Sequence, residues 1–70
     1  MQYGIEEVSA TDLGPEHIGR IIEHEYAGTA WWQILGIAPA GDSAWVHTAH
    51  RNPIYIEPGG AARLLVIPGR

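Results

Sequence analysis

Short runs of β-branched and aromatic residues, each bounded by Gly, Pro, Asp or Asn, restrict the fold of this 70-residue chain. Such runs are typical of β-strands, and no segment keeps a helical apolar period over the roughly ten residues that an ordinary helix needs. The runs predict strands at residues 20–26, 29–37, 44–50, 54–57 and 63–67. We therefore expect an all-β fold, a small barrel of five strands, or of six if the N-terminal segment adds one.

Prolines and glycines predict where the chain turns. Pro15 suits the first position of a helix and Gly19 suits the left-handed residue after its end, so one helical turn is expected near the N-terminus. Leu13 and Ile18 flank this turn, and we expect both to pin it to the core. A second compact turn, at residues 58–62, is predicted before the last strand.

The order of these elements resembles a known group of proteins. The motifs are a helical turn in Leu-x-Pro-Glu-His-Ile-Gly, a strand ending Ile34-Leu35-Gly36-Ile37, a short Ile54-Tyr55-Ile56 strand and a Pro-Gly-rich turn. Over roughly residues 11–68 the chain resembles the small SH3-like β-barrel proteins of actinobacteria and their bacteriophages. The resemblance implies an SH3-like barrel and a phage-encoded accessory protein, and it carries over no catalytic residue. SH3-like barrels in general bind peptides, proteins or nucleic acids.

Composition disfavours several kinds of partner. Eight Asp and Glu outnumber four scattered arginines, whereas nucleic-acid binding needs clustered basic residues. No apolar run approaches the roughly 20 residues that span a bilayer, and the N-terminus lacks the pattern of a signal peptide. We therefore expect neither nucleic acid nor membrane as a partner, and a cytoplasmic location, in the host cell if the chain is phage-encoded.

The length predicts one domain, residues 1–70, in which residues 1–8 form an N-terminal strand or an arm. A domain of this size buries only about 60% of the surface that its unfolded chain exposes. The chain has no cysteine, so neither a disulfide nor a thiolate metal site can stabilise it. We therefore expect a homo-oligomer, a complex with a host or virion protein, or both.

The adjacent Trp31 and Trp32 lie in a predicted strand, so their rings point to opposite faces of a sheet. If residues 38–42 form a hairpin loop that sets Ile34 opposite Val46, then Trp32 and Ile34 share one face of the sheet. The resemblance to SH3-like barrels implies that Ile34 points inward, so Trp32 is expected in the core and Trp31 outside it. In this register Leu35 lies opposite Trp45, and Gln33 lies opposite His47. The predicted protein-binding face then consists of Trp31, Gln33, Leu35, Trp45 and His47, since exposed aromatic side chains often mark contact surfaces. Two alternatives stay open: residues 1–8 cover this face, or the register differs.

The sequence gives little support for a catalytic site or a metal site. The four histidines are His17, His24, His47 and His50. His47 and His50 are three apart, a spacing that points them to opposite faces of a strand rather than to one ion. The serines lack a nucleophile-elbow context, and no phosphate-binding glycine motif is present. We predict no catalytic, cofactor or metal residue.

These observations favour a non-enzymatic protein-interaction module, encoded by a bacteriophage, that self-associates or binds a host or virion protein. One alternative is a nucleic-acid-associated regulator that stacks bases on its exposed aromatic rings. The other alternative is a small structural component of the virion.

Overall fold

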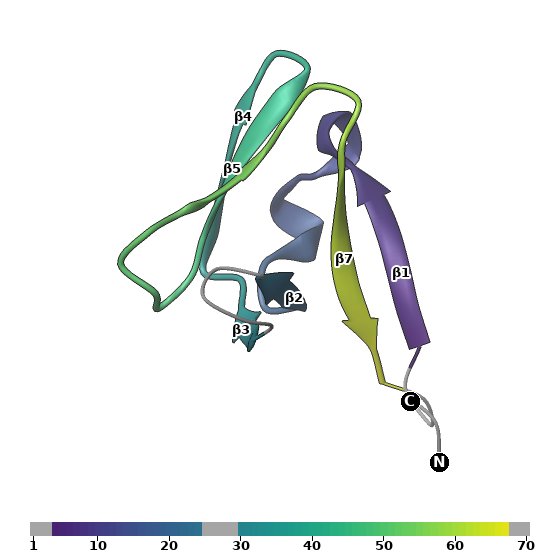
Figure 1. Cartoon of the computed structure of the whole chain (residues 1–70), viewed down its shortest axis with the longest axis vertical. Helices are drawn as coiled ribbons and strands as arrows, with labels where there is room; N and C mark the ends of the chain where they lie inside the picture. The colour runs from purple at the N-terminus through teal and green to yellow at the C-terminus, as the bar shows by residue number, and fades with distance from the viewer. Residues whose placement is uncertain (1–3, 25–29, 68–70) are drawn as a thin grey trace.

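The computed structural model describes residues 4–24 and 30–67. In this part of the chain, seven strands form two antiparallel sheets, and the helical structure is limited to two short 3₁₀ turns (Figure 1). The four-stranded sheet has the order β1-β7-β2-β3, and the three-stranded sheet has the order β4-β5-β6. The elements are β1 (Gly4–Ser9), η1 (Ala10–Asp12), η2 (Pro15–His17), β2 (Ile21–His24), β3 (Ala30–Gln33), β4 (Gly36–Ala40), β5 (Ser43–His47), β6 (Ile54–Ile56) and β7 (Ala61–Val66).

The all-β prediction is confirmed, but the described strands do not close into a barrel. The strand predicted at residues 29–37 divides into β3 and β4, which belong to different sheets. Consecutive amides at the division have partners in different places: Ile34 N–H donates to the Arg20 carbonyl at 2.7 Å, and Leu35 N–H donates to the His47 carbonyl at 2.8 Å. The chain therefore passes from one sheet to the other between these two residues.

The N-terminal predictions are partly confirmed. The described part of the predicted N-terminal strand forms β1, which pairs with β7 at the edge of the four-stranded sheet. Pro15 opens η2, and Gly19 adopts a φ of 95° after it, as expected. Leu13 is buried, but the role predicted for Ile18 is wrong, since its side chain is 48% exposed. Ile18 follows the last residue of η2 and has extended backbone angles, and its side chain is directed to solvent.

The turn predicted at residues 58–62 is shorter than expected. Gly60 N–H donates to the Glu57 carbonyl at 2.8 Å, and Gly59 has a φ of 80°. With Pro58 at its second position, this is a type II turn, in which glycine is favoured at the third position. Ala61 and Ala62 belong to β7 rather than to the turn, whereas β6 is short, as its flanking prolines predict.

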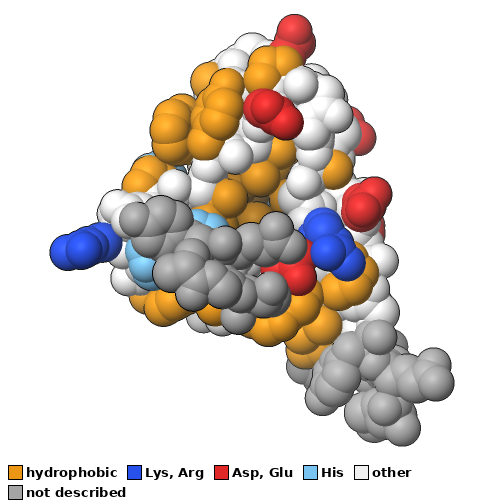
Figure 2. All heavy atoms as spheres, viewed as in Figure 1, with side chains coloured by type: hydrophobic (Ala, Val, Ile, Leu, Met, Phe, Trp, Pro, Cys, Tyr) orange, Lys and Arg blue, Asp and Glu red, His pale blue; other side chains and the backbone are white. Residues whose placement is uncertain are grey.

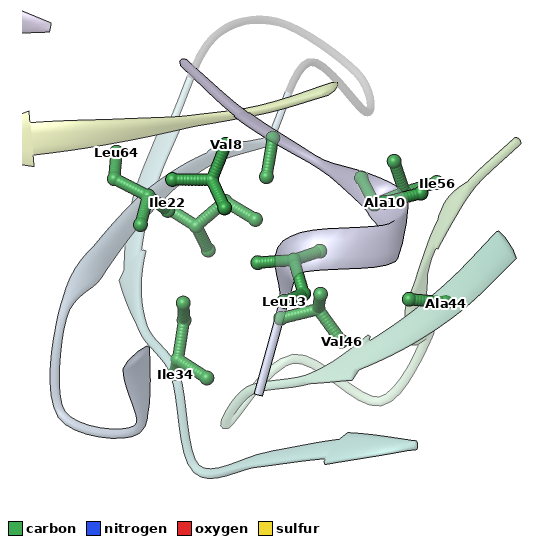
Figure 3. Close-up of a cluster of buried hydrophobic side chains, with 10 residues drawn as sticks. Val8, Ala10, Leu13, Ile22, Ile34, Ala44, Val46, Ile56 and Leu64 are labelled. Carbon is green, nitrogen blue, oxygen red and sulfur yellow. The ribbon is translucent and has the colours of Figure 1, made fainter. Parts of the chain in front are cut away.

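One cluster of aliphatic side chains holds the two sheets together (Figure 3). Its largest fully buried members come from β2, the β3–β4 connection, β5 and β7. The complete cluster consists of Val8, Ala10, Leu13, Ile22, Ile34, Ala44, Val46, Ile56, Ala62 and Leu64. Since both sheets and the η1 segment contribute to it, the outer faces of the sheets are left to solvent.

Candidate protein-interaction surfaces

The strand register predicted around the tryptophans is wrong. Ile37 lies opposite Val46 in the β4–β5 pair, so the predicted pairing of Ile34 with Val46 does not form. The predicted loop at residues 38–42 is a turn at Gly41 and Asp42, with Ala40 opposite Ser43. Gly41 has a φ of 66°, a backbone conformation that glycine adopts without strain and that suits a two-residue hairpin turn.

The five residues of the predicted face are all exposed, but strand pairing does not group them as predicted. Trp31 and Gln33 lie on β3, whereas Trp45 and His47 lie on β5 in the other sheet. Trp45 pairs with Ala38 and His47 pairs with Gly36, so the predicted partners Leu35 and Gln33 are displaced. Leu35, 58% exposed, lies on the connection between the sheets.

The first exposed surface is the outer face of the four-stranded sheet. Because Ile22 is buried opposite Leu64, the residues on either side of each point outward. Cross-strand partners then form two rows on this face, one of Ile5, Leu65, Ile21 and Gln33, and one of Glu7, Arg63, Glu23 and Trp31. The first row is mostly aliphatic, and the second carries three charges beside an indole ring.

Two features of this face have measurable geometry. Arg63 Nη1 donates to Glu23 Oε1 at 2.8 Å, and the Glu23 side chain is only 11% exposed. At the aliphatic end, a groove of 340 Å³ is lined by Gly19, Arg20, Ile21, Leu65, Val66 and Ile67. The one charged side chain of the lining, Arg20, donates to Glu6 Oε1 at 2.7 Å.

The second surface is the outer face of the three-stranded sheet, which we call the aromatic face and which consists of Gly36, Ala38, Trp45, His47 and Tyr55. The Trp45 and Tyr55 rings are cross-strand partners with centroids 4.8 Å apart, tilted by 48°. They remain 40% and 49% exposed. The neighbouring strand β4 contributes only Gly36 and Ala38, so the two rings stand above small residues.

The predicted face did not include Tyr55, although the alternation of Ile54, Tyr55 and Ile56 indicates one outward side chain between two inward ones. A hollow of 260 Å³ beside it is lined by Tyr55, Ile56, Glu57, Gly60 and Ala61. Figure 2 shows hydrophobic side chains gathered at the upper left, where Figure 1 places β4 and β5, with acidic side chains near the top. The hollow therefore joins Tyr55 of the aromatic pair to the acidic residue Glu57.

Trp32 lies on the inner side of β3, opposite the buried Ile22, but the prediction that it joins the core is wrong. Its side chain is half-buried, and its ring meets the edge of His50 at a centroid distance of 5.4 Å. His50 in turn meets His24 at 5.3 Å. β3 is the edge strand of its sheet, and the Trp32 ring there packs against His50.

The histidines have local structural contacts. His17 Nδ1 accepts a hydrogen bond from Gly14 N–H at 3.2 Å, and His50 Nδ1 accepts one from Asn52 N–H at 3.0 Å. Within residues 4–24 and 30–67, no group of three or more His, Asp or Glu side chains is placed to hold a metal ion. The same residues contain no helix of the length and hydropathy that crossing a membrane requires.

The alternative in which residues 1–8 cover the predicted face is not realised by the part of this segment that the structure describes. Val8 and its neighbours in β1 pair with β7, and neither β3 nor β5 is adjacent to β1 in a sheet. Residues 1–3 lie outside the described residues. Comparisons of the chain with protein-family models, curated proteins and solved structures find no match.

Proposed function

We propose that this protein is a non-enzymatic protein-interaction module that binds its partner through the aromatic face. The observation that carries this proposal is the Trp45–Tyr55 pair, two large rings in mutual contact that both remain about half exposed. Aromatic residues that lie together on a surface are typical centres of protein interfaces. The partner is a second copy of the chain, or a host or virion protein.

The energy available from covering the pair supports this proposal. Covering the exposed part of each ring removes roughly 80–100 Å² from water, worth about 2 kcal/mol at about 25 cal/mol per Å². Small domains commonly have a total stability of only a few kcal/mol. Leaving both rings in water therefore forgoes a free energy that is large for this chain, and a partner recovers it.

The distribution of arginines favours a protein over a nucleic acid. Arg20 and Arg63 are each engaged with a carboxylate of the same chain, Glu6 and Glu23 respectively. A nucleic acid requires several basic side chains that converge on its phosphates. With a net charge of −4, the chain repels a polyanion in general.

The remaining parts of the proposal rest on the sequence. We propose an SH3-like arrangement and a phage-encoded accessory protein of the host cytoplasm, on the order of motifs between residues 11 and 68. The segment that leaves one sheet at Ile34 and enters the other at Leu35 supports the SH3-like part, because small barrels commonly contain such a bent strand.

The proposal is tested by capture of partners from the cell that makes the protein. Immobilised wild type, Trp45→Ser and Tyr55→Ser are compared with Ile18→Ser, which removes a side chain of similar exposure from another surface. Circular dichroism confirms that each variant is folded. We expect specific proteins, the chain itself included, to bind the wild type and Ile18→Ser and to be lost from the other two. Equal retention by all four contradicts the proposal.

A further inference from the structure

Opposite charges lie at the two ends of the aromatic face. The β4–β5 turn places Asp42 at one end of the three-stranded sheet, and Glu57 follows β6 at the same end, since Ile56 pairs with Ala44. Arg51 lies in the β5–β6 connection at the other end (Figure 1). All three residues are exposed. The face therefore has an acidic end, an aromatic centre and a basic end.

These end charges are not compensated within the described part of the chain. Arg20 and Arg63 form ion pairs there, but Arg51, Asp42 and Glu57 take part in none among residues 4–24 and 30–67. Glu57 also lines the hollow next to Tyr55, so an acidic residue and an aromatic residue border the same space. A guanidinium group fits both features, since it pairs with a carboxylate and stacks on an aromatic ring.

We infer that the aromatic face docks on the aromatic face of a second copy of this chain. This inference rests on the proposed function and names its partner. A two-fold axis that lies between the faces, perpendicular to the strands, sets the strands of the two copies antiparallel. Each Arg51 then meets the acidic end of the other copy, and the two-fold symmetry gives this contact two times in the dimer. An axis parallel to the strands sets acid against acid and is disfavoured.

The same geometry places the aromatic rings. For Arg51 of one copy to meet Glu57 of the other, the axis must pass midway between these two residues along the strand direction. Glu57 lies two residues beyond Tyr55, the partner of Trp45, and Arg51 lies further away on the other side of Trp45. The axis therefore passes between the positions of Trp45 and His47. Each Trp45 ring then packs toward the other copy's His47, where Gly36 leaves room. Three short strands cover an area at the low end for a specific interface, so the dimer dissociates in the micromolar range or above.

Sedimentation equilibrium over micromolar to millimolar concentrations tests this inference. We expect Arg51→Glu and Glu57→Arg each to weaken the dimer about tenfold, because each sets like charges together twice. The double variant Arg51→Glu/Glu57→Arg exchanges the two charges, and we expect its dissociation constant to return to within about threefold of the wild-type value. High salt is expected to reduce these differences.

Net charge provides the control. Glu57→Arg changes the net charge from −4 to −2, which lowers general repulsion between copies, so a weaker dimer in this variant reports the local contact. Asp12→Arg makes the same change in charge on η1, which packs on the inner side of β5 and not on the aromatic face, and is expected not to weaken the dimer. A monomeric wild type, or a double variant no tighter than the single ones, overturns the inference. If binding of a foreign protein still requires Trp45 in that case, the proposed function stands without the dimer.

Discussion

Glu23 shows how a charged side chain is accommodated on an otherwise exposed sheet face. Its side chain is 11% exposed, and it lies on β2 between Trp31 on one neighbouring strand and Arg63, its hydrogen-bond partner, on the other. The other carboxylate–arginine pair, Glu6 with Arg20, has nearly the same length but lies in solvent, with Glu6 51% exposed. The two pairs therefore differ in burial and hardly in geometry.

This difference predicts unequal effects of removing each arginine. Arg63→Ala leaves a nearly covered carboxylate without its charged donor, so we expect a loss of about 1–3 kcal/mol in the free energy of unfolding. Arg20→Ala removes an exposed pair and is expected to cost less than about 1 kcal/mol. Urea unfolding followed by tryptophan fluorescence measures both values. An equal or larger loss of stability for Arg20→Ala contradicts the conclusion that the nearly covered Glu23 depends on Arg63.

The exposure of single residues was predictable where strand alternation holds, and was not where a neighbour decides it. Trp31 is exposed and Trp32 points inward, as adjacency in a strand requires. That Trp32 rests on His50 could not be foreseen, because the loop after β5 brings this ring from a distant part of the sequence. Ile18 illustrates the same limit, since its apolar character gives no information on where the chain turns away.

Among the strands, the division between β3 and β4 is the feature that the sequence did not reveal. Residues 29–37 read as one apolar run, and the sheet change depends on hydrogen bonds to Arg20 and His47, both far from it in sequence. Pro39 was assigned to a loop because residues 38–42 look like a short connection between two strands of a hairpin. It lies in β4, at the edge of the three-stranded sheet, where a strand has one side without a partner and tolerates proline.

The turn between β6 and β7 was located correctly by its prolines and glycines, and it makes a sharp prediction. Gly59 has a φ of 80°, and an added Cβ meets no atom within 4 Å, so Gly59→Ala adds backbone strain without a clash. We expect it to lower the free energy of unfolding by about 1–2 kcal/mol.

Gly4→Ala is the matched control for this turn. An added Cβ at Gly4 lies 3.9 Å from the Val66 Cβ, an ordinary contact, and Gly4 has no left-handed φ. Its effect is expected to stay within about 0.5 kcal/mol. Thermal unfolding of both variants gives the comparison, and the assigned turn type is wrong if Gly59→Ala is as stable as Gly4→Ala.

For the molecule as a whole, the small core determines what is left outside. The buried cluster consists of aliphatic side chains, whereas the Trp31, Trp45 and Tyr55 rings all lie outside it. A chain of this length cannot enclose every large apolar group, so some remain for contact with other molecules. Strand alternation predicted an exposed Trp31, and the chain length predicted that this small domain needs support from another molecule.

The grouping of the exposed residues could not be predicted in the same way. Trp31, Leu35 and Trp45 were expected on one face, yet Trp31 belongs to one sheet and Trp45 to the other. The β4 register differs from the predicted one by three residues, which displaces Leu35 from Trp45, and the change of sheet after Ile34 separates Trp31 from both. Register depends on turn length, which Gly41 and Asp42 make shorter than the Pro39-containing segment suggests.

The indole N–H signals of the three tryptophans test directly whether the aromatic face is the contact surface. Each ring reports a different environment: Trp31 the outer face of the four-stranded sheet, Trp32 the contact with His50, and Trp45 the aromatic face. In nitrogen–proton correlation spectra recorded on dilution from millimolar to micromolar concentration, we expect the Trp45 signal to move most and the others to stay nearly constant. Signals that do not change with concentration, or a shift at Trp31 with Trp45 unchanged, would contradict this assignment.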